Sequence, residues 1–137
     1  MKALRYSLVA LLALTLSACH PDTCDTPFGL GGTIDITMPE FHALVNVGGA
    51  LTVNRGHHGI FVTRTGISDF VAFECSCPNG CDVRVLPDEE WGNSVLTCPV
   101  CTSRFSSLNG MPYDGSATPC PLYEYSTDFD GQNLTIY

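Results

Sequence analysis

Two closely spaced cysteine pairs constrain this chain more than any other feature. Three residues separate Cys77 from Cys81, two separate Cys98 from Cys101, and sixteen lie between the pairs. Two thiolates a few residues apart on a tight turn can face one ion, and two such loops complete a tetrahedron of ligands. The spacing therefore predicts a four-thiolate site for zinc, for a single iron ion or for an iron–sulfur cluster.

The same cysteines also allow a metal-free structure. In an oxidising compartment the two loops could be joined by disulfides instead. Bound zinc contributes on the order of 10 kcal/mol to folding, and a disulfide contributes about 2–4 kcal/mol. Both kinds of cross-link would hold the loops together, so both alternatives stay open. Cys75, two residues before Cys77, is a reserve metal ligand.

Residues 1–18 are typical of a bacterial signal peptide. A basic start, Lys2 and Arg5, precedes an apolar run over residues 8–16 that is shorter than the about 20 residues needed to span a bilayer. The run ends in Leu-Ser-Ala-Cys19, which resembles the lipobox of bacterial lipoproteins. This resemblance implies export, a lipid on Cys19 and anchoring to a membrane at its periplasmic or cell-surface face. The alternative is an ordinary signal peptide cut nearby, with Cys19 free or in a disulfide.

The charge of the exported chain limits its partners. Removal of the signal peptide leaves four arginines, no lysine and all fourteen acidic residues, a formal charge of −10. Such a surface repels phosphate backbones and excludes nucleic acid as a partner, while a basic protein remains compatible with it. The sequence has no nucleophile–base pair, phosphate-binding loop or paired carboxylates, so we expect no enzymatic activity from this chain on its own.

Short alternating stretches predict an all-β fold. Residues 19–32, rich in Pro and Gly, are expected to form a tether, and residues 33–137 a single domain. The turn 54–59, with adjacent His57 and His58, is interpreted as a solvated hairpin tip. We expect an antiparallel β-sandwich or small barrel with the cysteine loops at one end. Its strands are predicted over residues 34–38, 43–47, 51–53, 60–64, 70–73, 83–86, 94–96, 123–125 and 134–136.

Two segments resemble the cluster-binding loops of the Rieske iron–sulfur family. Residues 72–80, Ala-Phe-Glu-Cys-Ser-Cys-Pro-Asn-Gly, are similar to the first loop, in which Cys-x-His follows a strand. Residues 98–105, Cys-Pro-Val-Cys-Thr-Ser-Arg-Phe, are similar to the second loop, Cys-x-x-His-Gly-Ser-x-Phe. An early hairpin and a closing strand also fit, so the resemblance covers residues 33–137. It implies a Rieske-like antiparallel sandwich with two cysteine-bearing loops.

The ligand set departs from the family's pattern. A Rieske centre holds one iron by two cysteines and the other by two histidines. The resemblance places the cysteine ligands at Cys77 and Cys98. It places the histidine ligands at Asn79 and Cys101, and no histidine occurs after residue 58. Thiolate in place of imidazole adds negative charge, which lowers the reduction potential of a cluster. The implied ligands of a 2Fe-2S cluster, or of a single zinc or iron ion, are therefore Cys77, Cys98, Cys101 and Cys81.

The resemblance also implies a disulfide between Cys75 and Cys120, since Cys120 falls in the loop that covers the cluster in Rieske folds. Cys24 has no evident partner within the chain and could make an intermolecular bond. The resulting hypothesis is a membrane-anchored electron-transfer or structural metal module that serves a redox protein partner. The alternative is a metal-free, disulfide-stapled structural or interaction lipoprotein with a degenerate Rieske fold.

Overall fold

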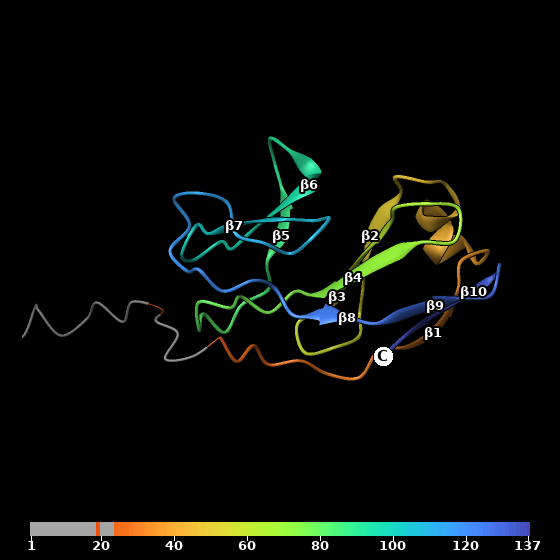
Figure 1. Cartoon of the computed structure of the whole chain (residues 1–137), viewed down its shortest axis with the longest axis horizontal. Coiled ribbons are helices and arrows are strands. Elements are labelled where there is room, and N and C mark those ends of the chain that lie inside the picture. Colours follow the sequence, from red (N-terminus) through yellow and green to blue (C-terminus); the bar gives the residue numbers. More distant parts are fainter. Residues whose placement is uncertain (1–18, 20–23) are drawn as a thin grey trace, which may run out of the picture.

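In the part of the chain that the structure describes, the strands form three antiparallel sheets (Figure 1). The computed structural model describes Cys19 and residues 24–137. All strand pairings described there are antiparallel, which confirms the all-β prediction. In chain order the elements are β1 (Gly32–Asp35), the 3-10 helix η1 (Pro39–Val45), β2 (Ala50–Val53), β3 (Ile60–Arg64), β4 (Phe70–Glu74), β5 (Leu86–Asp88), β6 (Gly92–Thr97), β7 (Arg104–Ser106), β8 (Glu124–Tyr125), β9 (Thr127–Phe129) and β10 (Asn133–Ile136).

Two of the sheets supply the first hydrophobic core. One has the strand order β1-β10-β9 and the other β2-β3-β4-β8. Alternate side chains of a strand point to opposite faces, so each of these two sheets contributes one face to this core. The buried residues of this core are Ile34, Ile36, Leu44, Val53, Ile60, Val62, Phe70, Ala72, Tyr125, Leu134 and Ile136.

The hairpin β3–β4 separates the first core from a second one. In β3, Ile60 and Val62 belong to the first core, whereas Phe61 between them belongs to the second. Phe61 pairs with Phe73 of β4, which lies on the same side. A strand buried on both faces needs an unbroken apolar run, and residues 60–62 supply it. The cysteine loops therefore lie over a hydrophobic layer of their own.

The third sheet, β5-β6-β7, stands apart from the other two and carries the second cysteine loop (Figure 1). Leu96 of β6 pairs with Phe105 of β7, and both side chains are completely buried in the second core. The strand predicted over residues 94–96 lies within β6. The strand predicted over residues 83–86 overlaps β5 only at Leu86.

The strand predicted over residues 43–47 is wrong, because Pro39–Val45 form the 3-10 helix η1. Pro39 stands at the start of the helix, where its fixed φ is favourable and its missing N–H costs no hydrogen bond. Leu44 is buried in the first core and Phe41 packs against it. Their spacing of three residues matches the period of a 3-10 helix. The strand predictions from the sequence also omitted the short strands β7 and β9.

The predicted tether, residues 19–32, is fastened to the domain from Cys24 onward. Cys24 forms a disulfide with Cys120. The ring of Phe28 stacks on Tyr123 at a centroid distance of 4.2 Å, and the N–H of Gly29 donates to Tyr125 Oη at 3.1 Å. The signal peptide predicted for residues 1–18 lies outside the described residues. In the described part of the chain no helix is long and apolar enough to cross a bilayer.

Glu74, at the end of β4, is a completely buried carboxylate. Its Oε2 accepts hydrogen bonds from the N–H of His57 at 2.8 Å and the hydroxyl of Tyr125 at 2.7 Å. Its Oε1 accepts from the N–H of His58 at 2.8 Å and the hydroxyl of Ser76 at 3.1 Å. Burial raises the pKa of Glu74, but these four donors together lower it more, so the net pKa lies below its usual range.

Gly56 is required beside this carboxylate. A Cβ at residue 56 would lie 2.4 Å from Oε2 of Glu74. The backbone there also has φ +73°, in the left-handed region that favours glycine. The turn between β2 and β3 can therefore close over Glu74 only with glycine at this position.

We expect Glu74→Gln to lower the free energy of unfolding by about 3 kcal/mol, because the glutamine NH2 group would face buried donors. The folded-state pKa of Glu74 lies below its ordinary value of 4.5. Its stabilisation is therefore present above that pH and lost as the pH falls through the folded-state pKa. Urea unfolding of wild type and variant between about pH 3 and pH 7 measures both effects. The exposed Glu124→Gln is the control, and equal midpoints for wild type and Glu74→Gln at neutral pH would contradict the prediction.

Candidate metal centre

The structure brings together the sulfurs of the four cysteines that the sequence grouped. The Sγ atoms of Cys77, Cys81, Cys98 and Cys101 all lie within 4.8 Å of one another. Those of Cys77 and Cys101 are 3.7 Å apart. Four sulfurs around one tetrahedral zinc ion, each at about 2.3 Å from it, are about 3.8 Å apart. The group therefore has the dimensions of a metal site.

The first cysteine loop, residues 75–85, follows β4 and closes on itself. The N–H of Cys77 donates to the carbonyl of Val83 at 3.2 Å, and the N–H of Val83 donates to the carbonyl of Cys81 at 2.7 Å. Gly80 has φ +71°, which only glycine adopts without cost. This tight reversal directs the Cys77 and Cys81 side chains to the same point.

The second cysteine loop joins β6 to β7. The N–H of Cys98 donates to the carbonyl of Ser103 at 2.9 Å, and the N–H of Thr102 donates to the carbonyl of Cys98 at 3.0 Å. Thr102 has φ +59°, and among the described residues it alone has a positive φ without being glycine. A β-branched residue in this region is strained. The strained backbone conformation at Thr102 therefore allows the loop to direct Cys98 and Cys101 toward one point.

The environment of Cys77 opposes thiolate formation in the absence of a cation. Cys77, Cys81 and Cys98 are 2%, 5% and 0% exposed, whereas Cys101 is half-buried. Burial raises the pKa of the Cys77 thiol, and the neighbouring Cys98 raises it further, although the N–H of Asn79 counteracts them. A bound metal ion would supply the positive charge that this apolar site lacks. The residues present thus fit a metal ion.

Ser103 supports the sulfur of Cys101. Its Oγ lies 3.2 Å from Cys101 Sγ and accepts a hydrogen bond from the N–H of Ala117 at 2.9 Å. That acceptor role leaves the hydroxyl proton available to the sulfur. Burial raises the pKa of Cys101, but hydrogen bonds from Ser103, Cys98 and Cys77 together lower it more, and the net pKa lies below that of a free thiol. The sequence signal for Ser103 is the serine at this position in the motif of the second loop.

Cys81 has a second partner for its sulfur. It forms a disulfide with Cys19, although the same Sγ belongs to the four-sulfur group. A sulfur in a disulfide is not a thiolate ligand, so the two roles exclude each other. With the disulfide formed, the thiols left at the site are Cys77, Cys98 and Cys101.

Asn79 and Cys75 lie beside the group without joining it. Asn79 is buried, and its side-chain amide donates to the carbonyl of Cys19 at 3.3 Å. Cys75, the predicted reserve ligand, is a completely buried free thiol outside the four-sulfur group. Burial, together with the charge of Glu74, raises the pKa of Cys75 to about 12. Because its sulfur lies outside the four-sulfur group, Cys75 is not placed to act as the reserve ligand.

The disulfide expected between Cys75 and Cys120 is wrong, because Cys120 pairs with Cys24 instead. Cys75 is completely buried and belongs to the second core together with Phe61 and Phe73. The N-terminal segment, fixed by Tyr123 and Tyr125, brings Cys24 to Cys120. The pairing also corrects the expectation that Cys24 has no partner within the chain.

The comparisons with known proteins find a similar structure but no matching sequence. No family profile and no curated protein matches the sequence. The structure is similar to the ferredoxin of carbazole 1,9a-dioxygenase from Nocardioides aromaticivorans IC177, with 17% sequence identity and a TM-score of 0.45. The similarity covers 82% of this chain and 97% of that chain. A similarity this low does not identify ligands in this chain, so the chemistry of the site depends on the residues present here.

We expect Thr102→Gly to raise the free energy of unfolding by about 1 kcal/mol, because glycine adopts the left-handed conformation without strain. Thr102 is exposed, so its side chain contributes little packing. Thr102→Ala is the matched control, since it removes the branch but keeps the Cβ that causes the strain. Thermal unfolding of the three proteins measures the effect. Equal stabilisation by alanine and glycine would show that the backbone conformation is not the cause.

Proposed function

We propose that the domain binds one metal ion through the thiolates of Cys77, Cys81, Cys98 and Cys101. The mutual proximity of the four sulfurs, all within 4.8 Å, carries this proposal. In a two-iron cluster the two thiolate pairs lie at opposite ends of an inorganic core and are farther apart. A single zinc or iron ion therefore suits the group better than a 2Fe-2S cluster. The two loop motifs support a Rieske-like domain whose histidine ligand positions hold Asn79 and Cys101.

The identity of the ion would decide what the site does. Zinc has no redox chemistry and would make the site structural, whereas iron would let it carry one electron for another protein. Cys101 is the most exposed of the four ligands, and its neighbour Val100 is 57% exposed. A redox partner would approach the ion from this side. The acidic charge of the exported chain favours a partner with a basic surface.

We further propose that the protein is exported and anchored through a lipid on Cys19. The lipobox-like sequence around Cys19 supports the lipid. A thioether to the lipid and a disulfide to Cys81 would both use the single sulfur of Cys19, so they exclude each other. Lipidation would leave Cys81 free to complete the four-thiolate site. Membrane anchoring and metal binding therefore support each other in this proposal.

The second candidate function is a metal-free structural or interaction module. The disulfides Cys19–Cys81 and Cys24–Cys120 favour it, since the first of them removes a ligand from the metal site. This candidate and the metal site differ in one measurable property. In the metal-bound protein Cys81 is a thiolate, whereas in the metal-free module it is oxidised.

We expect the mature protein, purified from the periplasm without added metal, to contain one ion per chain. Cys98→Ser should lose most of it, because Cys98 is a completely buried ligand. Cys75→Ser is the matched control and should keep the metal, because Cys75 is equally buried but lies outside the group. Elemental analysis gives the stoichiometry. Thiolate-to-iron absorption bands would identify an electron carrier, and zinc without colour would identify a structural site.

Two results of that analysis would contradict the single-ion proposal. Iron with inorganic sulfide would establish a cluster in place of a single ion. A chain without metal, in which Cys81 reacts with thiol reagents only after reduction, would establish the disulfide-stapled module.

We expect cells fed alkyne-tagged palmitate to label the wild-type protein and Cys24→Ser, but not Cys19→Ser. The lipid needs the sulfur of Cys19, whereas Cys24 serves only the disulfide with Cys120. In-gel detection of the tag measures the labelling. Unlabelled wild-type protein, with Cys19 and Cys81 found joined by peptide mapping, would refute the anchor and favour the second candidate.

A further inference from the structure

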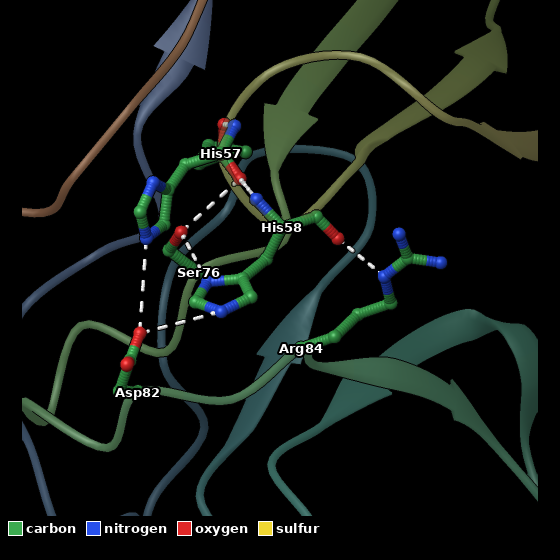
Figure 2. Close-up of polar contacts among 6 residues, drawn as sticks. His57, His58, Ser76, Asp82 and Arg84 are labelled. Atoms are coloured by element: carbon green, nitrogen blue, oxygen red, sulfur yellow. Dashed lines mark hydrogen bonds and ion pairs between the residues drawn. The ribbon is translucent and has the colours of Figure 1, made fainter.

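A second group of metal-ligating atoms lies next to the first cysteine loop (Figure 2). The Nε2 atoms of His57 and His58 lie 3.7 Å and 3.3 Å from Oδ1 of Asp82. One ligating atom from each of the three side chains lies within 4.8 Å of the others. The histidines come from the turn between β2 and β3, and Asp82 follows Cys81. Two separate segments thus converge on one point.

Hydrogen bonding settles which nitrogen of His58 carries the proton. The Ser76 hydroxyl has one proton, which it donates to Oε1 of Glu74 at 3.1 Å. Nδ1 of His58 lies 3.0 Å from the same Ser76 Oγ and must therefore be the donor of that contact. In neutral His58 the lone pair is then on Nε2, which faces the carboxylate of Asp82. Two acceptors face each other there, and a cation between them would satisfy both.

The backbone holds both histidines in place for this arrangement. The N–H groups of His57 and His58 each donate to Glu74 at 2.8 Å. Their rings meet edge to face, with centroids 4.4 Å apart and an interplanar angle of 90°. Adjacent residues of an extended strand point to opposite faces. Here the glycine-flanked turn lets both imidazoles reach Asp82.

Asp82 is available as a ligand. Its side chain is 88% exposed, and the ion pairs described for it are those with the two histidines. The nearby Arg84 is directed elsewhere, because its Nε donates to the carbonyl of His58 (Figure 2). The side chains of His57 and His58 are 44% and 24% exposed, so an ion would reach the site directly from solvent.

We propose that His57, His58 and Asp82 bind a divalent transition-metal ion of the zinc class, with water at the remaining positions. Imidazole and carboxylate ligands suit Zn²⁺, and three protein ligands leave an open position. Ser76 is a positioning residue, since its contact with Nδ1 fixes the tautomer of His58, as hydrogen-bond partners of metal-bound histidines do. The ion would join the β2–β3 turn to the first cysteine loop. This site uses no cysteine and does not depend on the four-thiolate site.

The test is titration of the full mature protein with Zn²⁺, followed by NMR of the histidine ring protons. We expect the His57 and His58 signals to shift together with increasing Zn²⁺, while the exposed His42 does not respond. Asp82→Asn, nearly isosteric and on the surface, should weaken this binding at least about 10-fold, and Ser76→Ala by about 10- to 100-fold. His42→Ala is the matched control and should bind like the wild type.

The proposal is overturned if the His57 and His58 signals do not respond to Zn²⁺, or if Asp82→Asn binds as tightly as the wild type. A response of His42 at the same concentrations would mean non-specific binding and would overturn it equally. Repeating the titration with Cys98→Ser separates the two sites. The ring-proton shifts should persist in that variant even though the cysteine centre has lost its metal.

Discussion

Burying the carboxylate of Glu74 costs several kcal/mol unless donors surround its oxygens. The donors come from the β2–β3 turn, the start of the first cysteine loop and β8, so these three parts must assemble together. Tyr125 extends the network, because its hydroxyl gives its proton to Glu74 and accepts the N–H of Gly29. One buried charge thus determines where the turn, the loop and the N-terminal segment lie.

The two hydrophobic cores differ in composition, and the cysteines of the four-sulfur group belong to the second one. The first core is made of aliphatic and aromatic side chains and contains no cysteine. The second core places Phe61, Phe73 and Phe105 among the buried cysteines. Water is excluded from three of the four sulfurs, while Cys101 remains partly accessible. The four-sulfur group therefore lies over a folded sandwich that has its own hydrophobic core.

Local patterns in the sequence were sufficient to predict strands β2, β3 and β4 and the cysteine group. The alternating or apolar runs over residues 51–53, 60–64 and 70–73 lie in β2, β3 and β4. The four-sulfur group was predictable because each pair is set by its own tight turn. The strand predicted over residues 43–47 was wrong because the alternation there is too short to distinguish a strand from one turn of helix. The proline that starts the helix lies before this stretch.

Long-range contacts could not be predicted in the same way. The pairing of Cys24 with Cys120 spans 96 residues and depends on the path of the N-terminal segment. His57 and His58 fit the predicted turn, but their convergence on Asp82 depends on Glu74, which lies sixteen or seventeen residues farther along the chain. The sequence shows Glu74 only as an acidic residue at a strand end. Its burial and its four donors are properties of the assembled fold.

The disulfide between Cys24 and Cys120 turns most of the domain into a covalent ring. Every loop between these two cysteines lies inside that ring, including both cysteine loops and the β2–β3 turn. If a protease cuts the backbone once in any of these loops, the two pieces stay joined. A chain held at its N-terminal end would therefore keep its domain after a single cut. The two pieces would separate only after the disulfide is reduced or a second cut is made.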